Sequence, residues 1–394
     1  MKICLIHEEY PEETNFGGVA TYQKLMSKYL KQLGHEVTII TRSLTNDQEY
    51  YENGIRVIRI FWEKDKKEIK DYKSYRKKVA RKIKELVKNN EIDVIETPDW
   101  GAETIEYFDN RKVPIVVKLH TPLCIWQIYN KSGLGKKLNE NMLKWEKHII
   151  KNADKVISCS YILLEKLKKQ YPDLEYSKIK VIPNPYNKTE HQINYDHNSN
   201  IILYVGSLEQ RKGVDILAKT IPNFLQKCDS NVIFRFIGKD TDRNDKHISM
   251  ISYIKDIVPK EFHKNLEFIG HVKNSDLEKY YAEAKIGVIP STFDNLPYVA
   301  QEMLLTGLPI VASDNTGVKE MIEDNKSGIL FKNLDSKDLT KKLIDLYDNN
   351  QKRNLISKNA RDYIIKIHDP IKIAQTMEKI YKEAIYEFNN PHKN

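Results

Sequence analysis

Short runs of apolar and β-branched residues alternate with longer amphipathic stretches along most of the chain. This alternation is typical of parallel α/β sheets, in which each buried strand is followed by a helix that covers the sheet. The first elements that the pattern predicts are a strand at 2–6, a helix at 18–33 and a strand at 36–41. Further strands are expected at 56–60, 93–96, 114–119, 155–158, 178–182, 200–205, 232–237, 266–269, 286–289, 310–312 and 328–331.

The predicted strands fall into two series separated by a polar segment. This segment, 184–200, is rich in Asn and His and lacks apolar periodicity, so we place a linker at 186–199. The two series predict two doubly wound domains, at 1–185 and 200–369. Ligands of such sheets bind beyond the carboxyl ends of the strands. Four loops therefore become candidates for function, those that follow the strands at 2–6, 114–119, 200–205 and 286–289.

Composition narrows the class of protein. Hydrophobic residues make up 40% and charged residues 30% of the 394 residues, which excludes disorder as the main character of the chain. Charged residues interrupt every apolar run well before the ~20 residues of a membrane span. The N-terminus reaches acidic residues too early for a signal peptide. The four cysteines are scattered without CxxC spacing, so we expect reduced thiols in a cytoplasmic protein.

The net charge of +9 is concentrated in one region. Residues 51–200 hold 30 Lys and Arg against 21 Asp and Glu, and 66–88 is a basic, helix-like segment. This segment is interpreted either as an ordinary solvated helix face or as a contact with an anionic membrane surface or lipid-linked acceptor. Nucleic-acid binding is the weakest interpretation, because no base-reading module accompanies the charge.

Two candidate residues stand in the loops of the first series. Gly17 and Gly18 open a predicted helix, where backbone N–H groups can receive a phosphate or sugar, although paired glycines also simply make turns. His120 ends the strand at 114–119 and could bind a ligand or move protons. It could equally be a buried histidine with both nitrogens satisfied.

The loops of the second series carry more chemistry. Gly206 to Gly213 leads into a helix and contains Arg211 and Lys212, which suit a diphosphate; the alternative is a capping turn with exposed charges. The fourth loop precedes a helix at 298–305, and Pro297 is expected at the first helical position. Asp294 lies in this loop and Glu302 follows eight positions later. The next strand leads into a polar loop that contains Gly317.

These motifs together resemble the retaining glycosyltransferases of family four, which have the GT-B fold. The most specific part is Ser291 to Ala312, STFDNLPYVAQEMLLTGLPIVA, which is similar to the family's acidic residue, seven others and Glu, followed by a Gly-x-Pro strand. Lys212 occupies the lysine position of the family's phosphate loop. Residues at 17–18, 96–100, 120 and 183–185 also fall where members carry similar ones. Asp294 stands where Glu is usual, and Ser207 where Arg is common.

The resemblance implies two Rossmann-like domains that face each other across a cleft, with a C-terminal helix at about 370–390 completing the first. It implies a donor site in the second domain and an acceptor site in the first. The donor-binding residues that it implies are Gly18, Gly206, Ser207, Arg211, Lys212, Asn295, Leu296, Pro297, Glu302 and Gly317. The catalytic residues that it implies are His120, Lys212 and Asp294. No metal or other cofactor is expected, and the Asp240-Thr241-Asp242 sequence is interpreted as a solvated loop.

The function expected from the resemblance is transfer of a sugar, with retention, from a nucleotide diphosphate sugar to an acceptor hydroxyl. A UDP-sugar is the expected donor, and a surface glycan or its lipid-linked precursor is the expected acceptor. The protein would act in the cytoplasm or peripherally at the inner face of the membrane. Two alternatives stay open: a nucleotide-sugar epimerase of the same fold, and a non-catalytic partner subunit of another transferase.

Overall fold

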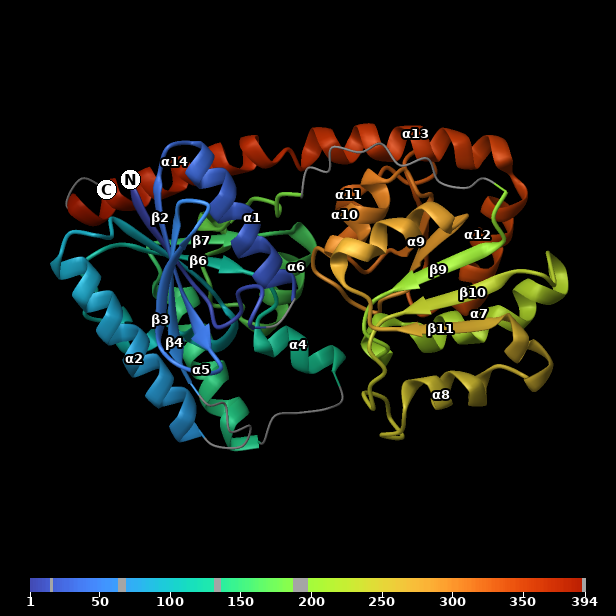
Figure 1. Cartoon of the computed structure of the whole chain (residues 1–394), viewed down its shortest axis with the longest axis horizontal. Coiled ribbons are helices and arrows are strands. Elements are labelled where there is room, and N and C mark those ends of the chain that lie inside the picture. The colour runs from blue at the N-terminus through green and yellow to red at the C-terminus, as the bar shows by residue number, and fades with distance from the viewer. Residues whose placement is uncertain (15–16, 63–68, 131–135, 187–197, 392–394) are drawn as a thin grey trace. The chain divides into compact units, whose positions relative to one another are not determined.

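The computed structural model describes residues 1–14, 17–62, 69–130, 136–186 and 198–391. The chain forms two compact units, each built on its own sheet (Figure 1). The first unit comprises Met1–Gln127, Gly133–Asn187 and His368–Asn394, and the second comprises Ile128–Ser132 and Lys188–Ile367. The predicted linker at 186–199 lies almost entirely outside the described residues, as do residues 66–68 of the basic segment.

The first unit holds an eight-stranded sheet in the order β3-β4-β2-β1-β5-β6-β7-β8. Its strands are β1 (Lys2–Ile6), β2 (Glu36–Ser43), β3 (Gln48–Glu52), β4 (Ile55–Phe61), β5 (Val94–Pro98), β6 (Ile115–Leu119), β7 (Lys155–Ser158) and β8 (Lys180–Val181). Its helices are α1 (Gly18–Gln32), α2 (Ile69–Lys88), α3 (Ile105–Phe108), α4 (Leu123–Tyr129), α5 (Lys136–Asn152), α6 (Tyr161–Gln170) and α14 (Pro370–Asn389). Strands β5 and β6 are buried along their whole length, because helices cover both faces of the sheet.

The C-terminal helix α14 belongs to this first unit although it lies far away in the sequence (Figure 1). The hydroxyl of Tyr381 on α14 donates a hydrogen bond of 2.6 Å to Glu96 Oε2 on β5. Both residues are buried, so this bond ties α14 to the middle of the sheet. Asp369 caps the helix by accepting hydrogen bonds from the N–H groups of Ile371 and Lys372.

The second unit holds a parallel six-stranded sheet in the order β11-β10-β9-β12-β13-β14. Its strands are β9 (Ile201–Val205), β10 (Ile233–Ile237), β11 (Leu266–Gly270), β12 (Ile286–Ile289), β13 (Ile310–Ser313) and β14 (Ile329–Phe331). Its helices are α7 (Val214–Lys227), α8 (Met250–Ile257), α9 (Leu277–Glu283), α10 (Tyr298–Leu305), α11 (Val318–Met321), α12 (Ser336–Asp348) and α13 (Asn350–Ile367). Numbered within the unit, the strand order is 3-2-1-4-5-6, that of the dinucleotide-binding folds.

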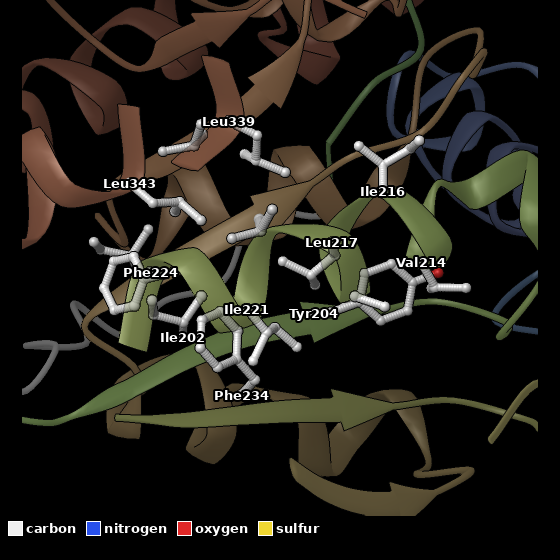
Figure 2. Packing of buried hydrophobic residues seen from close by; sticks show 14 of the residues in the cluster. Ile202, Tyr204, Val214, Ile216, Leu217, Ile221, Phe224, Phe234, Leu339 and Leu343 are labelled. Carbon is white, nitrogen blue, oxygen red and sulfur yellow. The ribbon is translucent and has the colours of Figure 1, made fainter. Parts of the chain in front are cut away.

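The core of the second unit lies between its sheet and helices α7, α8 and α12 (Figure 2). Ile221 and Phe224 on α7 pack against Phe234 on β10, and the rings of Phe224 and Phe234 meet edge to face at 5.6 Å. Leu339 and Leu343 on α12 close the cluster. This packing fixes β9 and α7, and therefore also the glycine-flanked loop between them.

Each predicted strand is present, with its ends within two residues of the expected positions. The pattern predicts only parallel strands. One further strand, β3, was not predicted, and it pairs antiparallel with β4. Its sequence, QEYYE, is polar on both faces, so it lacks the apolar run that identifies a buried strand. The turn before β4 is Asn53-Gly54, with φ values of 49° and 76°. Asn-Gly is the typical sequence of a two-residue hairpin turn, so this pair is the one local signal for β3.

The basic helix α2 has one strongly charged face. Exposed basic residues follow one another on this face at helical spacing, namely Lys73, Lys77, Arg81, Lys84 and Lys88. Arg76 differs from them: it is buried, donates to the carbonyl of Gly101 and stacks over Trp145 at 4.2 Å. In the described part of the chain, no helix is long and apolar enough to cross a membrane.

Candidate functional site

Three loops of the second unit meet at the point where the strand order reverses. They are 206–213 after β9, 290–297 after β12 and 314–317 after β13, all at carboxyl ends of parallel strands. The N–H of Thr292 donates to the carbonyl of Arg211, and the N–H of Gly317 donates to the carbonyl of Asp294. The backbones of the three loops therefore hold one another, at the position where ligands of such sheets bind.

Two glycines allow this close approach. A Cβ atom on Gly213, whose φ is +70°, would lie 1.8 Å from the carbonyl oxygen of Pro290. A Cβ atom on Gly317 would lie 1.6 Å from the carbonyl oxygen of Asn295. Any side chain at either position would push the loops apart. Gly317 thus serves loop packing, and its N–H is already occupied by Asp294.

Lys212 and Asp294 form an ion pair between the first two loops. Their side chains are 23% and 16% exposed, so the pair is partly shielded but still reaches solvent. Burial opposes ionisation of Asp294, but the charges of Lys212 and Arg211 outweigh it and hold the pKa of this carboxyl below its ordinary value. Two predicted catalytic residues, 82 positions apart in the chain, are therefore in contact.

Arg211 also faces this region, and a buried carboxylate holds it. Its guanidinium donates to Glu209 Oε1 at 2.6 Å, and Arg243 donates to Glu209 Oε2 at 2.8 Å. Burial raises the pKa of Glu209, but the neighbouring cations reverse this effect and keep it below the usual range. Glu209 and Arg243 were not among the predicted residues. An acid two positions before a pair of basic residues could have suggested Glu209. Arg243 comes from the loop after β10, which is far away in the sequence.

That loop contains the Asp240-Thr241-Asp242 sequence and is not simply solvated. Thr241 Oγ1 donates to the carbonyl of Leu208 at 2.6 Å, so the loop lies alongside the glycine-flanked loop. The carboxylate of Asp240 accepts from Ser249 Oγ and from the N–H of Ile251 at the start of α8. Its role in the structure is therefore to hold a helix end. Among the described residues, no three His, Cys, Asp or Glu side chains are grouped as metal ligands.

The fourth predicted loop differs from expectation at Pro297. This residue has ψ of 124° and precedes the first turn as the N-cap residue of α10, rather than occupying the first helical position. An extended ψ is incompatible with helical geometry, and the helix begins at Tyr298. Asn295 and Leu296, near the end of this loop, are buried, and Asn295 donates its N–H to Asp294 Oδ1 at 3.1 Å.

Ser207, in the loop after β9, is exposed, and its carbonyl accepts a hydrogen bond from the hydroxyl of Tyr204.

Glu302 lies on the second turn of α10 and has a partner on another helix. The hydroxyl of Tyr281, a buried residue on α9, donates to Glu302 Oε2 at 2.6 Å. Burial raises the pKa of Glu302 to about 7, and this hydrogen bond works in the opposite direction. Tyr281 was not predicted as a site residue, because its spacing on α9 indicates only a core position.

His120 and Gly18 belong to the first unit. His120 follows β6, where its N–H donates to Asp99 Oδ1 at 2.6 Å and its ring meets that of Tyr22 at 4.9 Å. Burial, Lys118 and His7 hold the pKa of His120 well below its ordinary value, so the imidazole is neutral at physiological pH. A neutral imidazole can both donate and accept a hydrogen bond but cannot neutralise a phosphate.

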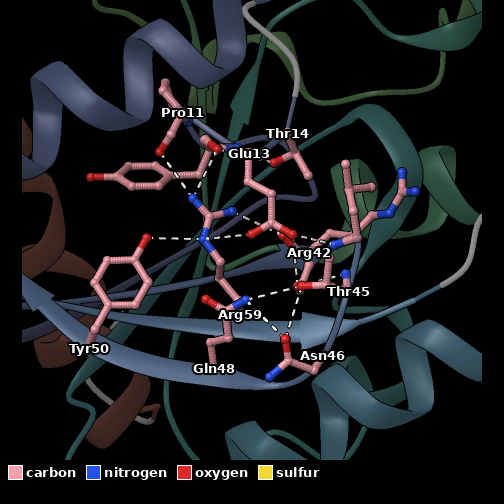
Figure 3. A network of polar contacts seen from close by, with 12 residues as sticks. Pro11, Glu13, Thr14, Arg42, Thr45, Asn46, Gln48, Tyr50 and Arg59 are labelled. Atoms are coloured by element: carbon pink, nitrogen blue, oxygen red, sulfur yellow. Dashed lines mark hydrogen bonds and ion pairs between the residues drawn. The ribbon is translucent and has the colours of Figure 1, made fainter.

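Arg59 on β4 holds the segment at 10–13, which follows β1 (Figure 3). This buried guanidinium donates to the carbonyls of Tyr10 and Pro11 and forms an ion pair with Glu13 at 3.4 Å. Gly17 caps α1, and a Cβ atom there would lie 2.7 Å from a carboxylate oxygen of Glu9. The start of α1 therefore already has an acid beside it, as the helix dipole favours.

Comparison with known proteins identifies the family of the chain. Residues 186–363 match the family model described as glycosyl transferases group 1, and residues 16–190 match the model described as glycosyltransferase family 4. Among curated relatives, the chain is 25% identical over 419 residues to the alpha-monoglucosyldiacylglycerol synthase of Acholeplasma laidlawii. The match covers 99% of this chain and 98% of the relative.

Solved structures extend the comparison to the fold. Sucrose-phosphate synthase from Thermosynechococcus elongatus superposes with a TM-score of 0.79 at 20% identity, covering 97% of this chain and 98% of the other. Anabaena HepE, solved in complex with UDP and glucose, superposes with a TM-score of 0.73 at 16% identity, covering 97% of this chain and 99% of the other. With largely parallel sheets in two α/β units, the fold is GT-B.

Proposed function

The chain belongs to the group 1 glycosyltransferases of family four and catalyses glycosyl transfer, and from this premise we propose that it moves a sugar from UDP to an acceptor hydroxyl with retention of anomeric configuration. The observation that carries the proposal is the contact between Lys212 and Asp294 where three loops converge. A cation held beside an acid at that position can stabilise a diphosphate and orient a sugar together.

Leaving-group charge is the physical difficulty of the reaction. The diphosphate becomes more negative as its bond to the anomeric carbon breaks, so a preorganised cation lowers the barrier. In our proposal Lys212 supplies that charge. Arg211, beside it, provides the second positive charge that other family members commonly obtain from an arginine at the position of Ser207. Asp294 then exchanges its ion pair for hydroxyls of the transferred sugar, and Glu302 accepts hydrogen bonds from the ribose.

On the acceptor side we assign His120 to a sugar hydroxyl near the reacting carbon. Its depressed pKa supports this role, because a neutral imidazole is a hydrogen-bonding group rather than a charge. Retention is supported by the resemblance to a retaining family. It is also consistent with a front-face displacement, in which the leaving phosphate itself receives the proton of the acceptor hydroxyl.

The donor and acceptor are proposed from relatives. HepE was solved with UDP and glucose, and the Acholeplasma relative is named for a glucosyl lipid. We therefore propose UDP-glucose or a related UDP-sugar as donor, and a glycolipid or a lipid-linked surface glycan as acceptor. The exposed basic face of α2 is consistent with an acceptor in an anionic membrane, because each basic residue near such a surface contributes about 1 kcal/mol.

The test is a transfer assay with purified protein and a panel of UDP-, ADP- and GDP-sugars, each with and without diacylglycerol and polyprenol-linked acceptors. We expect release of UDP that depends on an acceptor, and a product whose anomeric proton coupling matches that of the donor. Inversion in the product would refute retention. Acceptor-independent release of free sugar would favour an epimerase, and inactivity with every donor would favour a partner subunit; the comparisons support neither alternative.

A further inference from the structure

Glu302 depends on a residue from a different helix for its orientation. Helix α10 positions its backbone, but a glutamate side chain has three rotatable bonds and would lose entropy on binding a ligand. Tyr281 Oη lies 2.6 Å from Glu302 Oε2 and comes from α9, which precedes β12. The tyrosine is only 2% exposed, so its neighbours restrict the ring and its hydroxyl can hold the carboxylate in one place.

We infer that Tyr281 is a positioning residue for nucleotide binding, which fixes Glu302 so that its carboxylate can accept from the ribose hydroxyls. This inference rests on the proposed function and deepens it. A carboxylate offers about four acceptor directions, and the tyrosine hydroxyl uses one of them on Oε2. Oε1 is then free to receive the two neighbouring hydroxyls of a ribose.

The same contact also favours the charged form of Glu302 against the effect of burial. Burial raises the pKa of Glu302 to about 7, and the hydrogen bond from Tyr281 lowers it. The other charged residues of α9 are Glu278, Lys279 and Glu283, of which Glu283 pairs with Arg235. The shift at Glu302 arises from burial and Tyr281 rather than from these groups. Burial and the nearby carboxylate raise the pKa of Tyr281, so its hydroxyl stays a donor.

Removing this hydroxyl should therefore affect binding in a pH-dependent manner. Without the donor, the pKa of Glu302 rises further, and the carboxylate becomes protonated at a higher pH than in the wild type. A protonated carboxyl is a weaker acceptor for ribose hydroxyls. We expect Tyr281→Phe to bind UDP about five- to tenfold more weakly near neutral pH. Near pH 9, where Glu302 is ionised in both proteins, the deficit should shrink.

The experiment is calorimetric titration of UDP into the full chain between pH 6 and 9. Because the phosphate of UDP also titrates, the readout is the ratio of variant to wild-type affinity at each pH. Tyr280→Phe is the matched control, since it removes a hydroxyl from the preceding residue. The ring of Tyr280 lies 5.6 Å from the guanidinium of Arg235. In a Glu302→Gln background, Tyr281→Phe should cause little additional loss, because the group it orients no longer titrates.

Two further arms separate the possible failures. Glu302→Asp keeps the charge but shortens the side chain away from Tyr281, so it should show a loss similar to that of Tyr281→Phe. If the ratio of variant to wild-type affinity for UDP is independent of pH in Tyr281→Phe and equals that of Tyr280→Phe, the inference is wrong, and the proposed function still stands. Wild-type protein that binds UDP, ADP and GDP equally poorly overturns the proposed function, and the role of Tyr281 with it.

Discussion

Replacing Lys212 by alanine should abolish most turnover and cost little stability. Lys212 lies at the carboxyl end of β9, follows Arg211 and is held by Asp294. If its ammonium stabilises the departing diphosphate, its loss removes a preorganised charge from the transition state. Removal of one such group from an active site costs roughly 10²–10³ in kcat, about 2.7–4 kcal/mol of barrier.

The effect on stability should be smaller, because the pair reaches solvent. Side-chain exposures of 23% and 16% place it between a surface ion pair and a buried one. Asp294 also keeps its hydrogen bond from the N–H of Asn295. We therefore expect Lys212→Ala to lower the free energy of unfolding by about 1–2 kcal/mol. This is the lower part of the range for a buried polar group that loses its hydrogen-bond partner.

The assay is steady-state transfer at saturating donor, together with thermal unfolding of each variant. Lys326→Ala is the control, because Lys326 pairs with Glu323 elsewhere in the second unit with side chains that are 70% and 51% exposed, and its loss should change neither property measurably. The double variant Lys212→Ala with Asp294→Asn should regain stability but not activity. Near-normal turnover of Lys212→Ala at saturating donor would show that the lysine does not act on the phosphate.

The remaining predictions concern three other features. Glu302→Gln should weaken UDP binding by about 1.5–3 kcal/mol, the range for hydrogen bonds to a charged group; unchanged affinity in calorimetry would exclude the ribose contact. Transfer should survive EDTA, since Asp240 already caps α8, and loss of activity that manganese restores would contradict this. Flotation with anionic vesicles should show binding that falls with salt and weakens when Lys77, Arg81 and Lys84 are changed to Gln, whereas absence of binding at low salt would mean that the basic face is merely solvated.

The strands could be predicted because most of them are buried on both faces. A strand such as β6, IVVKL, has an apolar run that contrasts with the amphipathic helices around it. β3 has no such contrast, and only its hairpin turn could have indicated it. Helix α2 shows a similar limit. Its charge run does not distinguish Arg76 from its neighbours, although Arg76 shares a helical face with the buried residues Val79 and Ile83.

The site could be predicted only as a set of loops, not as a set of contacts. Lys212 and Asp294 were each singled out, but a pairing across 82 residues depends on how closely two loops approach. Gly213 and Pro290 determine that approach through backbone contact, which periodicity does not reveal. Tyr281 was missed for a different reason: an aromatic residue on the buried face of a helix is normally core, and only its hydroxyl distinguishes it.

This loop packing lets the short side chain of Asp294 reach Lys212. Because Gly213 lies against the backbone of Pro290, the two loops are close enough for a short acid to reach Lys212. Three cations, Arg211, Lys212 and Arg243, face two carboxylates, Glu209 and Asp294. In the proposed function, a diphosphate that enters this region competes with Asp294 for Lys212, while Glu209 keeps its hold on the arginines. Donor binding would then release Asp294 from its cation, and Asp294 is the acid that our proposal assigns to the sugar.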